Sequence, residues 1–360
     1  MNQRNKLKFL ILFIVVPCIV FGKGTYKPRS LSSTFIIGHD SNPLRLSQNE
    51  IDQLSEKPYL LGAASEIYSR FLGISGKFSF YSKKAILARL FKEKTSFSLG
   101  YTYKNFTENK KKSSRYFTFK IDQQLGDYKH LYINYSLMPD YYLREYEDLD
   151  YIIVTNNIEN ISRYFSCMFD IEKLHVIYQK PLRIKGNKVK VGAFFERQIF
   201  DSYFTEFDLN IVGQTLEFSF NNDDNYFSKK RTVNLLYEKH IADNSTFLNE
   251  LLSTLYMNRD YKQSRYKLSF KQSMQDAKSF GFTIDIYKRN NTSKITTDQL
   301  HYRRKHTDKT ISVWYKKDRY KIMLSKRRRG SYSPFNWVKE LKTFDRYIVT
   351  LTTTLAKKKF

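Results

Sequence analysis

The stretch Arg115–Leu137 constrains the fold of this chain more than any other, because apolar and mainly polar residues alternate along it. In its first arm Phe117, Phe119 and Ile121 occupy every second position. A period of two places the two kinds of side chain on opposite faces of a β-strand. Gly126-Asp127 between the arms has a tight-turn composition, which predicts a β-hairpin. Each arm has about ten residues, enough for a tilted strand to cross a bilayer, but a soluble β-sandwich alternates in the same way.

The same alternation recurs from Glu66 to the end of the chain. Further runs start at Phe97, Phe165, Val189, Phe207, Val233, Tyr266, Phe280, Val313, Ile322 and Tyr347. At about 20 residues per strand and connection, the region predicts an all-β fold of about 14 strands, with 12 to 16 compatible. The apolar positions change parity between Ile211 and Leu216, which predicts a turn or a bulge near Val212-Gly213.

Met1–Gly22 has the organisation of a secretory signal peptide. A basic start precedes the apolar run Phe9–Phe21, and cleavage is expected before Lys23. A lipid anchor on Cys18 is the less favoured alternative, because Pro17 stands where a small residue is expected. No later stretch approaches the 18 apolar residues of a membrane helix, so a membrane-embedded form must be a barrel.

The segment 23–62 follows the leader, and the barrel is expected to occupy 63–360. Ser47 and Glu50 form a capping-box pattern that predicts a short helix over about Gln48–Glu56. We expect a periplasmic segment or plug here, or a poorly ordered lead-in. Pro139–Ile161 is polar and acidic, and is expected to be a long connection or a strand that extends beyond the membrane.

Three features favour a transmembrane barrel over a sandwich. Short turns such as Gly126-Asp127 alternate with longer polar connections such as Thr107–Ser114, as at the two unlike ends of outer-membrane barrels. The alternation also persists too far for an ordinary sandwich, and the polar faces suit a wet lumen. The 28 Tyr and 29 Phe favour strands and suit an aromatic girdle at the membrane interface.

With this leader, these strands and a terminal Phe360, the chain resembles bacterial outer-membrane β-barrel proteins as a class. The resemblance implies a closed antiparallel barrel in the outer membrane of a Gram-negative-type bacterium. It also implies that Phe360 is a signal for the barrel-assembly machinery. Outer-membrane lipid and lipopolysaccharide are then the surroundings, and a monomer is expected.

Polar residues that alternate with the apolar band are expected to face the lumen. These candidates are Lys120, Asp122, Gln124, Asn134, Lys188, Lys190 and Glu196. They carry both signs of charge, so a uniformly positive lumen is not predicted.

The formal net charge of +27 is concentrated in basic clusters towards the C-terminus. A predicted leader makes nucleic acid a poor partner, so contact with lipopolysaccharide phosphates or an anion-attracting vestibule is the better functional interpretation. Solvated loops and strand ends are the competing one. The candidate contacts are Arg303, Arg304, Lys316, Lys317, Lys326, Arg327, Arg328 and Arg329.

No pattern of catalytic or metal-binding residues stands out. The six histidines show no convincing ligand spacing, and G-x-S-x-G, P-loop and H-E-x-x-H motifs are absent from the sequence. Cys167 is the one cysteine beyond the leader, which excludes an intrachain disulfide in the mature chain. We therefore expect no enzyme activity, no cofactor and no metal.

The sequence thus leaves three functions open. The favoured one is a porin-like diffusion channel for small polar or anionic solutes. The second is a closed structural or assembly-related barrel whose basic surface contacts lipopolysaccharide or a partner protein. The third is a secreted soluble β-protein that binds polyanions.

Overall fold

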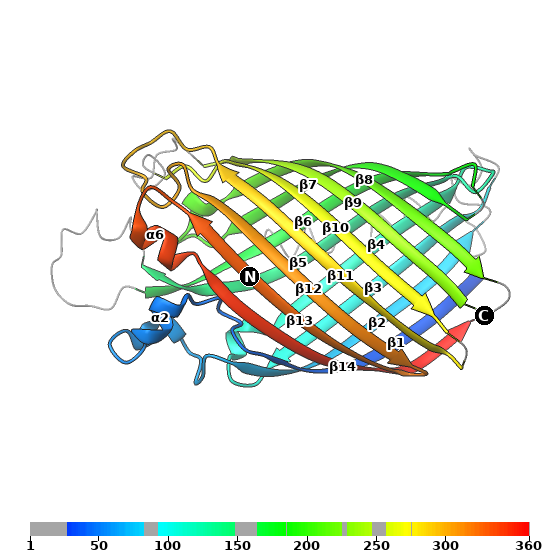
Figure 1. The fold of residues 1–360 in the computed structure, drawn as a ribbon, viewed down its shortest axis with the longest axis horizontal. Coiled ribbons are helices and arrows are strands. Elements are labelled where there is room, and N and C mark those ends of the chain that lie inside the picture. Colours follow the sequence, from blue (N-terminus) through cyan, green and yellow to red (C-terminus); the bar gives the residue numbers. More distant parts are fainter. Residues whose placement is uncertain are drawn as a thin grey trace.

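The computed structural model describes residues 27–82, 93–147, 164–184, 186–224, 229–246, 257–274 and 276–359. These residues form a closed antiparallel barrel of 14 strands, in which the last strand pairs with the first (Figure 1). The strands are β1 Lys27–Asp40, β2 Ser69–Ser82, β3 Thr95–Phe106, β4 Ser114–Gln124, β5 His130–Glu147, β6 Tyr164–Pro181, β7 Lys188–Phe200, β8 Leu209–Asp224, β9 Lys229–Asn244, β10 Tyr261–Ser273, β11 Lys278–Asn291, β12 Lys305–Lys317, β13 Tyr320–Tyr332 and β14 Phe344–Lys359. The predicted fold class and strand number are confirmed.

The two ends of the barrel differ in their connections. At the end where β1 begins and β14 ends, connections are as short as Asp318-Arg319 between β12 and β13. We call this the short-turn end. The opposite, long-loop end carries the helices α2 (Gln48–Asp52) and α6 (Asn336–Leu341). It also carries three short 3₁₀ helices at Pro58–Leu61, Lys110–Lys112 and Thr205–Phe207. In the β4–β5 hairpin the turn has positive φ at Gly126, Asp127 and Tyr128, which closes the two strands in a tight reversal.

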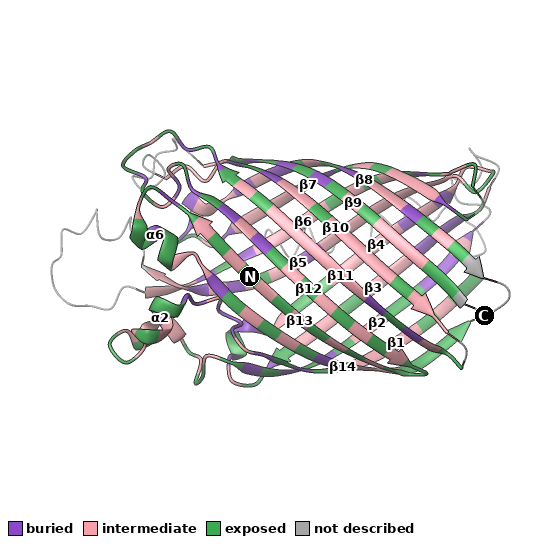
Figure 2. Cartoon of the chain, viewed as in Figure 1, coloured by how far each residue is buried: buried purple, intermediate pink, exposed green. Residues whose placement is uncertain are grey.

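Over most of their length the strands have one apolar face and one mainly polar face, and the register fixes which of the two lies outside. Phe119 pairs with Tyr135, Tyr135 with Leu174, and Leu174 with Phe195. Leu174 and Phe195 are each 43% exposed, so this row lies on the outer wall. Exposed and half-buried residues alternate along β12 and β13 in the same way (Figure 2). The outer wall is thus the apolar one, as the alternation predicted.

The barrel begins earlier than the sequence predicted. Lys27–Asp40, which was expected to lie outside the barrel within the segment 23–62, is strand β1 and pairs with β2 and β14. Its residues alternate too weakly to be recognised alone, and the partner strand that fixes it lies at the far end of the sequence. The predicted helix forms with its capping box, since Ser47 caps α2 and the Glu50 side chain accepts from the Ser47 backbone, but it ends at Asp52 and not near Glu56. It lies at the long-loop end, in the β1–β2 connection.

The bulge predicted near Val212-Gly213 is wrong. β8 is unbroken, and its pairings with β7 and β9 show no register shift. Leu209 and Ile211 point into the barrel instead, where they pack with Phe194, Ala242 and Tyr261 in a buried cluster. The Phe194 ring covers Gly213, where a Cβ atom would overlap it. Apolar residues inside the lumen, not a break in the strand, cause the change of parity.

The described residues cover the segments of the remaining predictions only in part. β5 extends through Pro139 to Glu147 with register shifts on either side of Tyr141 and Tyr142, as expected for a strand that runs beyond the membrane. The rest of that connection, the predicted leader and Phe360 lie outside the described residues. No helix of the described part is long and apolar enough to cross a membrane.

Candidate functional site

The inner wall formed by β10–β14 is rich in arginine near the long-loop end. Alternation explains the arrangement, since Arg327 and Arg329 face the lumen while Arg328 between them is exposed on the outer wall. The inward arginines of these strands are Arg265, Arg289, Arg327, Arg329 and Arg346. We call this set the basic wall.

Carboxylates, most of them buried, hold most of the basic wall in place. Asp308 on β12 accepts from Arg327 at 3.1 Å and from Arg329 at 2.7 Å. Asp285 on β11 pairs with both ends of the Arg265 guanidinium, at 2.9 and 2.7 Å. Bidentate pairs of this kind fix the position of a guanidinium as well as its charge.

Two further carboxylates complete this network. Glu238 on β9 lies 3.0 Å from Arg265, and Asp40 at the end of β1 pairs with Arg346. The arginines therefore stand in fixed positions rather than sampling many rotamers.

Arg289 differs from its neighbours because no carboxylate of the described residues forms an ion pair with it. Its guanidinium stacks on the Tyr261 ring at 3.6 Å, and its Nε donates to Gln263 Oε1 at 2.9 Å. On the next strand it pairs in register with His306. Within the described part of the chain, Arg289 therefore presents to the lumen a positive charge that is not paired with a carboxylate.

Three arginines from the long-loop end add to this charge. Arg45 in the β1–β2 connection is half-buried and donates to the Tyr141 hydroxyl at 3.0 Å. Arg259 stacks on the Phe207 ring at 4.7 Å. Burial and the neighbouring arginines lower the pKa of Arg304 to about 9, and its Nε has no hydrogen-bond partner among the described residues. The neighbouring arginines thus add to the effect of burial on the pKa of Arg304.

The β1–β2 connection folds over this end of the barrel. Leu44 and Leu46 are each 1% exposed and pack on Tyr142 of β5. Glu50 in α2 forms a buried ion pair with Arg144. α2 also contacts α6 of the β13–β14 connection, so the first and last connections meet across the long-loop end.

On the other side of the β1–β14 seam, the inner wall of β2–β4 carries pairs of serine and threonine side chains. Ser75 and Thr102 share a hydrogen bond of 2.9 Å, and so do Ser79 and Ser98. Lys120 lies over the Tyr132 ring at 4.1 Å. Paired hydroxyls satisfy one another and carry no net charge.

The register places the seven lumen candidates on the inward face. Lys120 pairs with Asn134, and Asp122 and Gln124 follow on the same side of β4. The others, Lys188, Lys190 and Glu196, share the inward side of β7 with the buried Phe194. Three of the seven form ion pairs, at 2.7 Å between Asp122 and His130, 2.9 Å between Lys190 and Glu217, and 3.3 Å between Glu196 and Lys173.

The structure separates the eight basic candidates, which the sequence treated as one contact surface. Lys316, Arg327 and Arg329 point inward, and Arg304 is buried at the long-loop end. Arg303, Lys317, Lys326 and Arg328 are exposed, but Lys317 lies at the short-turn end. A run of adjacent charges on a strand cannot form one surface, because successive side chains point to opposite faces.

Sequence reasoning missed Arg265, Arg289 and Arg346 because it searched for runs of basic residues. Arg265 and Arg346 have no adjacent basic residue, and Arg289 has only Lys288 beside it. Strand parity was the available signal, since Arg265 shares its face with Lys267 and Lys271. No group of three or more His, Cys, Asp or Glu that could hold a metal occurs among the described residues.

Comparison with known proteins gives structural likeness without sequence relatives. No protein-family model and no curated protein matches the sequence. The outer-membrane channel DcaP of Acinetobacter baumannii superposes with a TM-score of 0.42 at 7% identity, covering 93% of this chain and 99% of that one. OccK1 (OpdK) of Pseudomonas aeruginosa gives 0.39 at 7% identity, with 91% and 99% covered. An anion-selective porin from Comamonas acidovorans gives 0.36 at 9% identity, with 92% and 100% covered.

Values this low transfer neither a solute nor a residue role to this chain. The fold class follows from the strand register itself, in which 14 strands close without an edge. The chain is an antiparallel β-barrel with an apolar outer wall and a charged inner wall.

Proposed function

We propose that this barrel is a porin-like diffusion channel of the bacterial outer membrane, for small polar solutes with a preference for anions. The exposed apolar outer wall supports the membrane location, because such a surface is unfavourable in water. Ile74 at 48%, Ile311 at 53% and Leu324 at 48% exposure lie on three different strands of this wall. The short-turn end then faces the periplasm and the long-loop end the exterior.

The basic wall is the observation that carries the anion preference. Its arginines outnumber the carboxylates that face them, and Arg289 pairs with none among the described residues. Fixed positive charge beside a low-dielectric wall raises the local concentration of anions. Transport itself is diffusion and needs no bond chemistry.

Planar-bilayer recording tests the proposal. Purified protein should give discrete conductance steps, and the reversal potential in a KCl gradient should have the sign of chloride preference. A folded barrel that never conducts would remove the channel function. Conduction with cation preference would remove the anion part alone.

A closed structural barrel is the second candidate, and the covered long-loop end favours it. Leu44 and Leu46 of the β1–β2 connection are buried there against Tyr142 of β5. In this form the outer surface carries the function, and the exposed Arg303, Lys326 and Arg328 contact lipopolysaccharide phosphates. Shortening the β1–β2 connection should then open a conductance that the complete protein lacks.

The remaining parts of the proposal concern biogenesis. We propose cleavage of the leader near Gly22, recognition of Phe360 by the barrel-assembly machinery and a monomeric final state. Heat-modifiable migration of the membrane fraction on a gel, with N-terminal sequencing of the mature chain, tests the first and the last. Deletion of Phe360 should slow assembly and leave secretion unchanged.

A further inference from the structure

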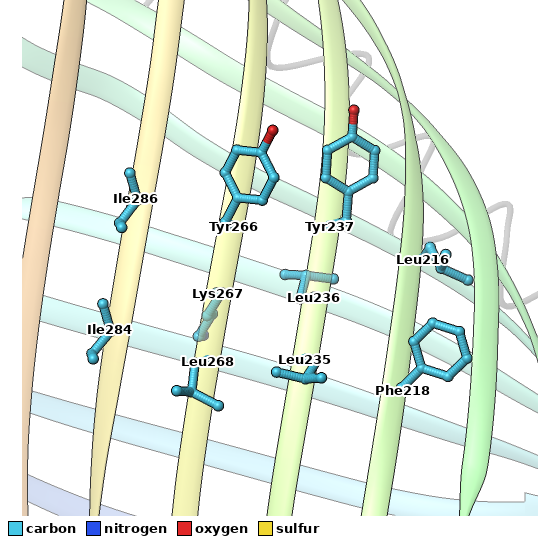
Figure 3. A pocket seen from close by; sticks show the side chains of 10 residues that line it. All are labelled: Leu216, Phe218, Leu235, Leu236, Tyr237, Tyr266, Lys267, Leu268, Ile284 and Ile286. Atoms are coloured by element: carbon cyan, nitrogen blue, oxygen red, sulfur yellow. The ribbon is translucent and has the colours of Figure 1, made fainter.

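The outer wall carries an apolar groove across β8–β11, of about 310 Å³ (Figure 3). Two rows of outward side chains in register form it. The upper row is Leu216, Tyr237, Tyr266 and Ile286, and the lower row is Phe218, Leu235, Leu268 and Ile284. Lys267 and Leu236 belong to the inward face between these rows. The groove is thus a feature of the membrane-facing surface and not of the lumen.

Two tyrosines mark the upper boundary of this groove. The rings of Tyr237 and Tyr266 lie 5.4 Å apart and are 40% and 47% exposed. Their hydroxyls point away from the lower row, towards the long-loop end (Figure 3). Tyrosines in this position place an apolar ring against acyl chains and a hydroxyl at the level of head groups.

Lysines form the next outward row towards the long-loop end. Lys239 and Lys288 flank Ser264 in register across β9, β10 and β11. Both are exposed, and the Lys288 ammonium lies 6.0 Å from the centre of the Tyr266 ring. Lys262 follows one outward position further on β10.

These lysines are available to a ligand. Among the described residues no carboxylate forms an ion pair with Lys239, Lys262 or Lys288. The nearest outward carboxylate along β9 is Asp243, which lies beyond Ile241 and bounds the basic row at its upper end. Along β9–β11, the apolar rows are therefore followed within a few residues by the tyrosine hydroxyls and then by the lysine ammonium groups.

We propose that this groove and its lysines bind one lipid A moiety of lipopolysaccharide. Acyl chains lie along the two apolar rows, and a phosphate on the sugar head group accepts hydrogen bonds from Lys239 and Lys288. The order of the groups on the protein matches this ligand, because its acyl chains adjoin a phosphorylated sugar head group. The inference rests on the outer-membrane orientation of the proposed function, but not on conduction.

Binding of fluorescently labelled, bis-phosphorylated lipid A to the detergent-purified barrel tests this site. The variant Lys239→Ala/Lys288→Ala should bind about 30-fold more weakly, because each basic side chain near an anionic surface contributes about fivefold. The matched control Lys271→Ala/Lys321→Ala removes two inward charges, from β10 and β13, that do not line the groove. It should stay within about twofold of the unmodified protein. Equal loss in both variants, or no loss in the first, overturns the proposal.

A dephosphorylated lipid A with the same acyl chains separates head-group recognition from general lipid contact. The unmodified protein should bind it about as weakly as Lys239→Ala/Lys288→Ala binds the phosphorylated form. If it binds both forms equally well, the lysines take no part and the proposal is wrong. Single-channel conductance of the same variant should be unchanged, so that failure of this site and failure of the channel are distinguishable.

Discussion

The inner walls of β10–β14 and of β2–β4 lie on either side of the β1–β14 seam but present different polar groups to the lumen. On β10–β14, arginines are held by carboxylates such as the buried Asp308 and the half-buried Asp285. On β2–β4, hydroxyl pairs such as Ser75 and Thr102 replace them. The first wall holds its charges in paired, fixed positions, whereas the second combines hydroxyl pairs with the charged side chains Lys120 and Asp122 on β4.

The largest expected difference between the walls is in stability. Asp308 is 4% exposed, so the double variant Arg327→Met/Arg329→Met leaves its charge buried without these partners. The free energy of unfolding should fall by about 3–5 kcal/mol. Urea titration of the barrel in lipid vesicles measures this loss.

A triple variant sharpens this result. Adding Asp308→Leu to the same two substitutions removes the orphaned charge, and much of the lost stability should return. If the triple variant is as unstable as the double one, packing of the arginine stems, and not charge, holds this wall together.

The hairpin β4–β5 and the helix α2 could be predicted because their signals are local. Period-two alternation fixes the faces of Arg115–Leu137, and a capping box needs only Ser47 and Glu50. The basic wall could be predicted only in part. Arg327 belongs to it and stands in a basic run. The run alone does not show which of its side chains face the lumen, because this depends on strand parity.

Other parts of the fold depend on contacts that sequence patterns do not show. Strand β1 is specified by pairing with β14, more than 300 positions away in the chain numbering. The apolar cluster around Phe194 and Leu209 lies inside the lumen, where the alternation rule expects polar groups. Which wall holds most arginine emerges only when 14 strands are placed side by side.

Two connections at the long-loop end, β11–β12 and β3–β4, should respond differently to a fall in pH. In the β11–β12 connection, beside the basic wall, burial lowers the pKa of His301 to about 4 from 6.5. The open connection binds a proton between these values that the folded one does not, so folding is weakened as pH falls from 6.5 towards 4. The expected loss at pH 5 is about 2 kcal/mol. Hydrogen exchange of residues 292–304 should accelerate between pH 7 and pH 5, after correction for intrinsic rates.

The connection between β3 and β4 provides the matched control. Despite the opposing effect of desolvation, hydrogen bonds from Thr107, Arg70 and Ser69 lower the pKa of Glu108 to about 2. Its contribution is present above its unfolded value of 4.5 and is lost only as pH falls towards 2. Exchange of residues 107–113 should therefore stay constant over the same interval. Equal acceleration of both connections would assign the effect to the whole barrel.

A smaller difference is expected in ion selectivity. Arg289→Gln keeps a polar side chain beside Tyr261 and removes the charge that lacks a carboxylate partner. The chloride-to-potassium permeability ratio should fall about two- to fourfold, since one partly screened charge is worth under about 1 kcal/mol. Lys120→Gln on the opposite side is the matched variant and should change the ratio less, because Asp122 lies on the same face. Reversal potentials in a KCl gradient give both values, and a larger effect at Lys120 would reverse the assignment of the selective wall.

The smallest effect is expected from the hydroxyl pairs themselves. Thr102→Val removes the 2.9 Å hydrogen bond to Ser75 with little change in volume. Both groups line a lumen in which water can replace the lost partner, so the free energy of unfolding should fall by less than about 1 kcal/mol. Selectivity should not change, because no charge is altered. A loss of several kcal/mol, measured by the same urea titration, would mean that this wall is as tightly coupled as the arginine one, and the contrast between them would then lie in charge alone.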